Sequence, residues 1–124
     1  MRHLPDTELA VMKAIWECGE DVTRVEMETH LKEYSWSANA VNTYLSRLTD
    51  KGFVTSRKEG KSLRYTPLIS REDYLAFDSR RVLTRLYDGK PRNFMAALAF
   101  NGLEEQDVAE LRALLDELSG GSNG

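Results

Sequence analysis

The stretch SANAVNTYLSRLTDKGF, residues 37–53, contains the start, the buried face and the end of one helix. Ser37 is a favoured capping residue, because its hydroxyl oxygen accepts a hydrogen bond from a free N–H group of the first turn. Apolar side chains then recur at the spacing of one helix face: Val41, Leu45 and Leu48. Gly52 favours termination, and a β-branched segment follows it. The run predicts a helix that packs on a core and leads into a strand.

The outward positions of this helix carry amides and hydroxyls where a solvated helix usually carries Glu and Lys. Amides pair bidentately with adenine, and hydroxyls contact several base edges. Asn39, Asn42 and Thr43 therefore suit a helix that enters the major groove of DNA. Ser37 and Arg47 suit contacts with phosphates. The alternative interpretation is that Asn and Ser near a helix start serve only as caps.

Two further helices are expected upstream. Residues 5–18 carry apolar side chains at a helical spacing, namely Leu9, Met12, Ile15 and Trp16. Thr23 and Glu26 form a capping box, which predicts a second helix from there to about Glu33. The inward positions of that helix are expected at Val25, Met27 and Leu31.

A β-hairpin is expected downstream, because β-branched and aromatic runs at 53–57 and 62–68 flank a turn at Gly60. Three helices followed by a hairpin is the order of a winged helix-turn-helix domain, which we assign to residues 1–69. The cations of the hairpin are expected to contact the DNA backbone: Arg57, Lys58, Lys61 and Arg64. Alternatively, a basic tip only protects an edge strand from pairing.

The remainder of the chain is predicted to be helical, so the fold class is mostly α with a small β-hairpin. Ser70 caps the first of these segments, and residues 119–124 (SGGSNG) are predicted to be a disordered tail. Residues 70–118 bury too little surface alone, which predicts a helical dimerisation domain. The expected interface residues are Leu83, Leu86, Phe94, Leu98, Phe100, Leu111, Leu114, Leu115 and Leu118. Alternatively, these apolar faces pack back on the winged domain.

Charge is distributed unevenly along the chain, whose net charge is −3. Residues 35–66 carry six basic and two acidic side chains, whereas residues 101–124 carry one basic and six acidic ones. Attraction to a polyanion depends on the local potential more than on the total. Double-stranded DNA is therefore a plausible partner of the middle segment.

Composition excludes several classes of protein. With 124 residues and no long apolar run, the chain is expected to have no membrane span, and without a signal-peptide pattern it is expected to be cytoplasmic. The single cysteine, Cys18, forms neither an internal disulfide nor a thiolate metal site and is expected to be a small core residue. His3 and His30 are too scattered for a metal site, and no phosphate-binding loop is present, so we expect no cofactor and no enzyme.

Three segments also resemble a known family: ELAVMKAIWECG, WSANAVNTYLSRLTDKGFV and LRYTPLISREDY. They are similar to the penicillinase-repressor family of BlaI, MecI and CopY type regulators, over about residues 4–118. The resemblance implies a homodimeric repressor whose winged helices each read one half of a palindromic operator. It implies DNA contacts at Ser37, Asn39, Asn42, Thr43 and Arg47. Several members are more basic at the positions of Asn39 and Asn42.

The resemblance is weaker for the inducing signal. In β-lactam-responsive members a sensor protease cuts an Asn-Phe bond in the C-terminal domain, whereas here Ala99 precedes Phe100. Phe100 is more simply a dimer-core aromatic. Copper-responsive members carry cysteine pairs near the C-terminus, and this chain has none there. The competing class is a winged helix that docks another protein rather than reading DNA, which net acidity favours and the basic hairpin disfavours.

Overall fold

The computed structural model describes the backbone of residues 1–123 and the side chains of residues 1–120. Contacts divide the chain into two compact units, Met1–Ser79 and Arg80–Gly124. The first unit contains α1 (Asp6–Cys18), β1 (Val22–Thr23), α2 (Arg24–Glu28), a 3₁₀ turn η1 (Lys32–Tyr34), α3 (Ala38–Asp50), β2 (Val54–Glu59) and β3 (Ser62–Pro67). Helix α4 (Arg71–Leu86) begins in the first unit and ends in the second. The second unit continues with α5 (Pro91–Phe100) and α6 (Glu105–Asn123).

Helix α3 forms as the sequence predicts. The Ser37 hydroxyl accepts a hydrogen bond from the Ala40 N–H group at 3.1 Å, which caps the first turn. The three inward side chains, Val41, Leu45 and Leu48, are at most 1% exposed. Gly52 takes a φ of +81°, which an L side chain adopts only with strain, and the Phe53 N–H group donates to the Leu48 carbonyl at 2.9 Å. This end of α3 turns the chain directly into β2.

Helix α2 is shorter than predicted, and the prediction that Val25 lies in the core is wrong. The Thr23 hydroxyl caps it by accepting from the Glu26 N–H group at 3.2 Å, but the α-helix ends at Glu28 rather than near Glu33. The N–H groups of the next two turn residues donate to carbonyls three residues back, so the chain tightens into 3₁₀ geometry. Val25 is 66% exposed, because it lies two positions, or about 200°, from the buried Met27.

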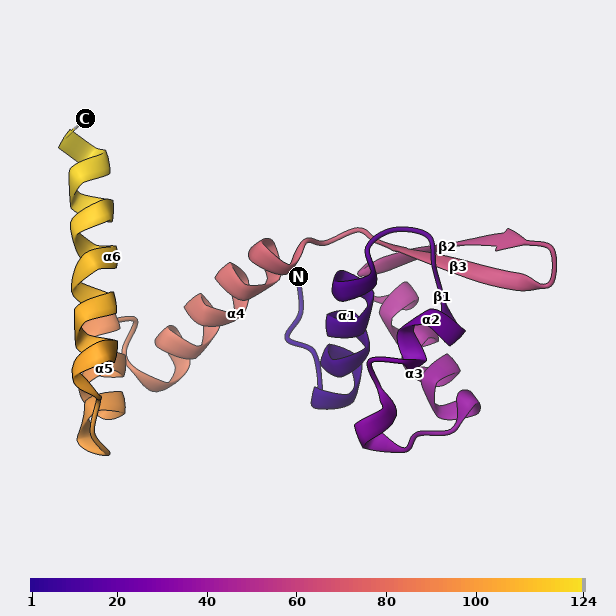
Figure 1. Cartoon of the computed structure of the whole chain (residues 1–124), viewed down its shortest axis with the longest axis horizontal. Coiled ribbons are helices and arrows are strands. Elements are labelled where there is room, and N and C mark those ends of the chain that lie inside the picture. The colour runs from indigo at the N-terminus through magenta and orange to yellow at the C-terminus, as the bar shows by residue number, and fades with distance from the viewer. Residues whose placement is uncertain (124) are drawn as a thin grey trace. The chain divides into compact units, whose positions relative to one another are not determined.

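The sheet has three antiparallel strands in the order β1-β3-β2 rather than the two of the predicted hairpin. Strand β1 was not expected, since two residues give no alternation to detect; Val22 pairs with Tyr65 and Thr23 with Arg64. The β2–β3 hairpin, called the wing here (residues 54–67), turns at Gly60, whose φ is +62°. Figure 1 shows the wing extending beyond the helices of the first unit. Leu63 and Tyr65 share a face, but Leu63 lies on that extension and is 46% exposed.

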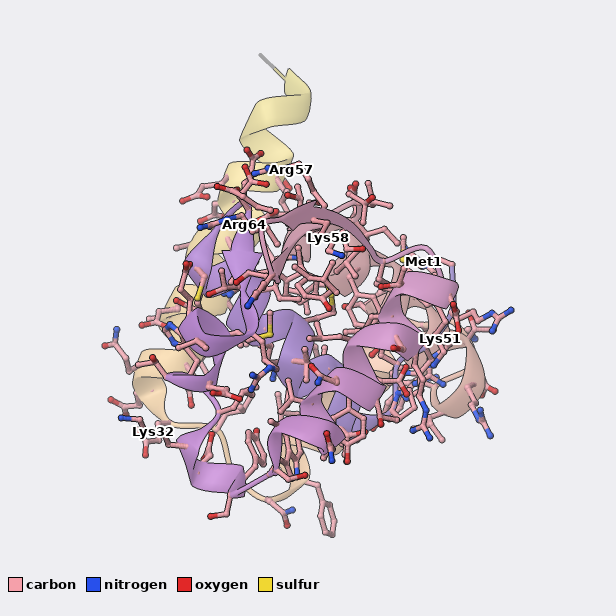
Figure 2. All side chains as sticks on the ribbon, turned by 90° about the vertical axis from the view of Figure 1, so that its right-hand side faces the viewer. Met1, Lys32, Lys51, Arg57, Lys58 and Arg64 are labelled. Atoms are coloured by element: carbon pink, nitrogen blue, oxygen red, sulfur yellow. The ribbon has the colours of Figure 1, made fainter. Side chains whose placement is uncertain are left out.

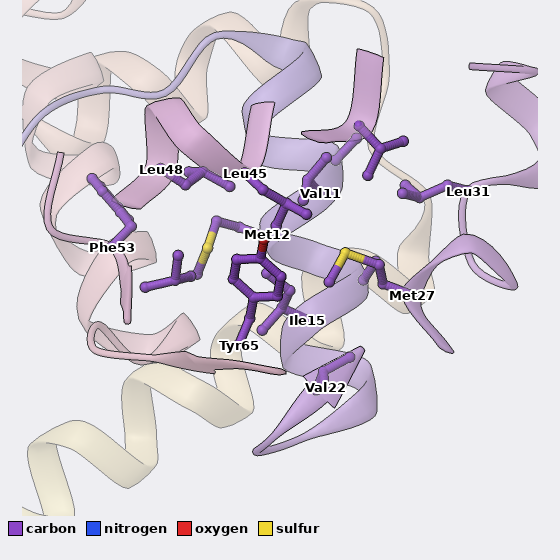
Figure 3. Close-up of a cluster of buried hydrophobic side chains, with 14 of the residues drawn as sticks. Val11, Met12, Ile15, Val22, Met27, Leu31, Leu45, Leu48, Phe53 and Tyr65 are labelled. Atoms are coloured by element: carbon purple, nitrogen blue, oxygen red, sulfur yellow. The ribbon is translucent and has the colours of Figure 1, made fainter. Parts of the chain in front are cut away.

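One hydrophobic core holds the first unit together. Figure 3 shows it between α1 and α3, with Met27, Val22 and Tyr65 closing its lower side. The first turns of α4 belong to the same core: Tyr74 is 1% exposed, and its hydroxyl accepts a hydrogen bond from the Leu4 N–H group at 2.8 Å. The ring of Tyr74 also contacts that of Phe53, with centroids 5.7 Å apart. The compact unit therefore ends at residue 79, ten residues beyond the predicted limit at 69.

The second unit exposes most of its apolar side chains. Tyr87 packs edge-to-face on Phe94, and the Asn93 side chain donates to the Tyr87 carbonyl at 3.1 Å, which fixes the start of α5. Helix α6 continues to Asn123, into the segment for which the sequence predicts a disordered tail, and Gly124 lies outside the described residues.

Candidate nucleic-acid interface

The outward face of α3 brings together the residues that the sequence predicted for contacts with bases and phosphates. Ser37, Asn39, Asn42, Thr43 and Arg47 are all exposed, because the opposite face of α3 is buried in the core. The face carries two amides and one guanidinium and no carboxylate between residues 37 and 47. It is therefore able to donate and accept hydrogen bonds without repelling a polyanion.

Two hydroxyls of this face already have partners. The Ser37 hydroxyl caps α3, and the Thr43 hydroxyl donates to the Asn39 carbonyl at 3.0 Å. A hydroxyl that donates within its helix still accepts hydrogen bonds through its oxygen. These hydrogen bonds restrict the rotation of the Ser37 and Thr43 side chains. The exposed amides of Asn39 and Asn42 are the groups of this face that can turn to fit a ligand.

A groove of about 280 Å³ separates α3 from the wing. It brings Asn42 of α3 and Lys61 of the wing turn to the same cavity. The other lining residues are Thr23, Arg24, Val25, Ser62, Leu63 and Tyr65. The sequence reasoning missed Val25 as a surface residue, because it placed Val25 on the inward face of the second helix.

The wing presents its cations unequally. Figure 2 shows Arg57, Lys58 and Arg64 together at one edge of the first unit. Arg57 and Arg64 form ion pairs with carboxylates of β2, of α2 and of the loop before β1. The Asp21 carboxylate, followed by that of Glu59, raises the pKa of Arg57 above its ordinary value. Lys58 and Lys61 are exposed, so these two present their charge directly to solvent.

Three aromatic side chains support the start of α3, a structural role that the sequence reasoning did not predict. Tyr34 and Trp36 stack with centroids 4.4 Å apart, and Trp36 meets Tyr44 edge-on at 5.0 Å. Tyr44 lies on α3 itself, so the stack ties the turn before α3 to its second turn. The sequence did contain a signal for this contact, because three aromatic residues occur within the eleven positions 34–44, around the predicted start of the helix.

A buried ion pair joins α1 to the end of α3 and was also missed. Lys51 Nζ lies 2.5 Å from Glu8 Oε1, and Glu8 is 2% exposed. A charge is buried in this way only when a partner compensates it. Glu8 stands among polar residues of the first turn of α1, and nothing in the sequence distinguishes it from the exposed carboxylates nearby.

Other predicted residues lie apart from this face. Cys18 is half-buried against the core, and burial, followed by the nearby carboxylates of Glu26 and Glu17, raises the pKa of its thiol. Among the described residues, no cluster of three or more His, Cys, Asp or Glu side chains could hold a metal ion. Within the same residues, no helix combines the length and the apolar character needed to cross a bilayer.

The residues predicted for dimerisation lie in the second unit and on α4. Leu83 and Leu111 are half-buried. The others are exposed: Leu86, Phe94, Leu98, Phe100, Leu114, Leu115 and Leu118. Phe100 is 90% exposed, an unusual state for an aromatic side chain at the end of an apolar helix.

The fold and the face of α3 define the class of protein as a winged helix-turn-helix protein. Three helices, a small antiparallel sheet and a projecting wing occur in that order, with the exposed amides on the third helix. The chain belongs to the penicillinase repressor family, whose sequence profile matches residues 4–117. It is therefore a member of a family of transcriptional repressors.

Individual relatives agree with this assignment. The chain is 33% identical over 121 residues to the penicillinase repressor of Bacillus licheniformis, covering 94% of each chain. It is 25% identical over 120 residues to the methicillin resistance regulatory protein MecI of Mammaliicoccus sciuri, covering 93% of this chain and 94% of that one. The solution structure of the DNA-binding domain of the repressor BlaI matches with a TM-score of 0.50 and 38% identity, over 58% of this chain and 88% of that chain.

Proposed function

We propose that this protein is a homodimeric transcriptional repressor that binds a palindromic DNA operator. Helix α3 enters the major groove, and the wing contacts the backbone beside it. Residues 1–69 serve as the DNA-binding domain and residues 70–118, which begin with α4, as the dimerisation domain. Occupancy of the operator blocks transcription stoichiometrically, in the cytoplasm and without a cofactor.

The observation that carries this proposal is the exposed polar face of α3 beside the wing lysines. Asn39 and Asn42 have amides that pair with adenine edges, and Arg47 lies one turn further along for a phosphate. Asn42 and Lys61 line one groove, so a base contact and a backbone contact come from adjacent elements. A helix that served only as structure would gain more from Glu and Lys at these positions.

Dimerisation is supported by the apolar side chains that the second unit leaves exposed. Phe100, Leu118 and Leu86 are 90%, 64% and 67% exposed. So many large apolar side chains exposed within one unit favour an interface. A second copy is the simplest partner, since a two-fold axis brings each apolar face against its own counterpart.

A two-fold symmetric dimer sets the form of the operator. The two α3 helices enter the same side of the duplex, so the half-sites lie one or two turns apart, at roughly 34 Å per turn. The operator is therefore expected to be palindromic.

Fluorescence anisotropy tests this proposal. The full-length protein is titrated against the DNA upstream of its own gene and against a shuffled duplex of equal length, at two salt concentrations. We expect saturable binding with a large preference for the upstream DNA, and sedimentation should give a dimer. Absence of binding to either duplex at low salt would refute DNA reading and favour a winged helix that docks another protein.

The resemblance to β-lactam-responsive repressors suggested a sensor protease acting near Phe100. Our proposal instead assigns Phe100 to the dimer interface. Its side chain is 90% exposed in the single chain, and burial of an aromatic side chain at an interface lowers the free energy of the dimer. Intact mass of the protein recovered from induced cells distinguishes the two roles, since cleavage after Ala99 leaves two fragments.

A further inference from the structure

Five side chains form a network on the outer half of the wing and beside it, called the wing cluster here: Asp21, Glu26, Arg57, Glu59 and Arg64. Arg57 Nη2 lies 3.0 Å from Glu59 Oε2 and 3.3 Å from Asp21 Oδ1. The same Glu59 oxygen lies 2.9 Å from Arg64 Nε. Glu59 therefore bridges both wing arginines, and the Asp21 carboxylate holds Arg57 from outside the hairpin.

Arg64 is held more firmly than a surface arginine. Its Nη1 donates to the Asp21 carbonyl at 3.0 Å and lies 3.8 Å from Glu26 Oε1. Its Nε atom is shielded from solvent and has no hydrogen-bond partner. The contact between this Nε and the Glu59 carboxylate is therefore an ion pair without a hydrogen bond. A guanidinium with this nitrogen covered has less freedom to turn toward a phosphate.

Asp21 is built into the wing through its backbone as well. Its φ is +52°, a conformation that Asp and Asn tolerate better than most residues. Its N–H group donates to the Thr66 hydroxyl at 3.1 Å, while its carbonyl and its carboxylate hold Arg64 and Arg57. Asp21 thus contacts three wing residues from the loop before β1.

The cluster removes most of the positive charge that the sequence assigns to the wing. The hairpin at residues 54–67 has four cations and one carboxylate, a net charge of +3. Asp21 and Glu26 reduce this to +1 for the wing together with its ion-pair partners. Isolated surface ion pairs contribute little to stability, so the main consequence of the cluster is for the electrostatic potential of the wing.

We propose that Asp21 and Glu59 are specificity-determining residues that withhold Arg57 and Arg64 from the DNA backbone, so that only Lys58 and Lys61 of the wing neutralise phosphates. This inference rests on the proposed DNA binding. Backbone neutralisation supplies essentially all of the affinity for non-specific DNA. Withholding two cations weakens binding to every sequence and leaves the base contacts of α3 a larger share of the discrimination.

The salt dependence of binding to a random duplex measures the number of phosphates neutralised. Each phosphate contact changes the slope of log affinity against log salt by about 0.9. Two conservative variants free the arginines without changing side-chain shape: Glu59→Gln and Asp21→Asn, the second of which keeps a residue type that tolerates the positive φ. Glu72→Gln removes the same charge at the start of α4, beyond the end of β3, and serves as the matched control. Lys61→Gln reports whether the wing touches DNA.

We expect Glu59→Gln and Asp21→Asn each to steepen the slope by about one unit and to raise affinity for the random duplex about eightfold at 0.1 M salt, because one more counterion is released. Glu72→Gln should match the wild type, and Lys61→Gln should flatten the slope by about 0.9. Circular dichroism of each variant checks that the fold is retained.

The other outcomes separate failure of the inference from failure of the proposed function. If Lys61→Gln flattens the slope while both carboxylate variants match Glu72→Gln, the wing contacts DNA and the carboxylates do not screen it, which overturns the inference alone. If Lys61→Gln has no effect, the wing lies away from the DNA and the inference also fails. If the wild-type protein binds neither the upstream duplex nor the random duplex at low salt, the proposed function itself is wrong.

Discussion

The ion pair between Glu8 and Lys51 gives a prediction that the structure defines closely. Lys51→Met keeps an unbranched apolar side chain of nearly the same length and removes the charged ammonium group. Glu8, which is 2% exposed, then holds a carboxylate without its partner at 2.5 Å. Removing one partner of a buried pair costs about 3–5 kcal/mol. Lys51 is itself 19% exposed, which admits some water, so we expect the low end, about 3 kcal/mol.

Urea unfolding of the full chain, followed by circular dichroism at one fixed protein concentration, measures this loss. The double variant Glu8→Leu with Lys51→Met removes both charges, and we expect its free energy of unfolding to lie within about 1 kcal/mol of the wild type. Lys58→Met, on the exposed wing, is the matched control and should cost less than about 0.5 kcal/mol. A single Lys51→Met variant as stable as the control, or a double variant less stable than the single one, would refute the buried-pair argument.

Asn42→Ala should cost about 1–3 kcal/mol in operator binding and relax discrimination at one base pair, measured by anisotropy against a set of single-base operator variants. Lys61→Ala should weaken binding to operator and shuffled duplex alike, because a phosphate contact carries no sequence information. Leu111→Asp should convert the dimer to monomers in sedimentation and remove cooperative binding of two half-sites, whereas the exposed Ser119→Asp should not. Cys18 should react with iodoacetamide more slowly than a free thiol at pH 8, because its raised pKa lowers the fraction of thiolate, which is the reactive form. The rate should increase as the pH rises toward the raised pKa of Cys18.

Local signals in the sequence predicted the parts of the fold that depend on local chemistry. The Ser37 cap, the buried face of α3 and the turn at Gly52 follow from hydrogen bonding and periodicity within seventeen residues, and the structure confirms them. The limits of α2 did not follow, because its end is fixed by 3₁₀ hydrogen bonds that let Leu31 remain in the core. Val25 was misplaced because a five-residue helix has too few positions to define a face.

The candidate site was predictable where function depends on residue type alone. The amides and hydroxyls of α3 are unusual for an exposed helix, and they lie on the face that the periodicity indicated. The state of the wing cations was not predictable, since Arg57 and Asp21 are 36 positions apart in the chain and meet only through the sheet. Counting charge along the sequence therefore overstated the positive potential of the wing.

The hydrogen bond from Leu4 to Tyr74 has a consequence for the folding of the protein during translation. Its two partners are separated by 70 positions, and the Tyr74 ring also covers Phe53 and Trp16. A nascent chain that has emerged only as far as residue 69 contains the complete helix-turn-helix and wing, yet lacks the side chain that closes its core. The first unit therefore completes its folding during translation only after α4 has begun to leave the exit tunnel.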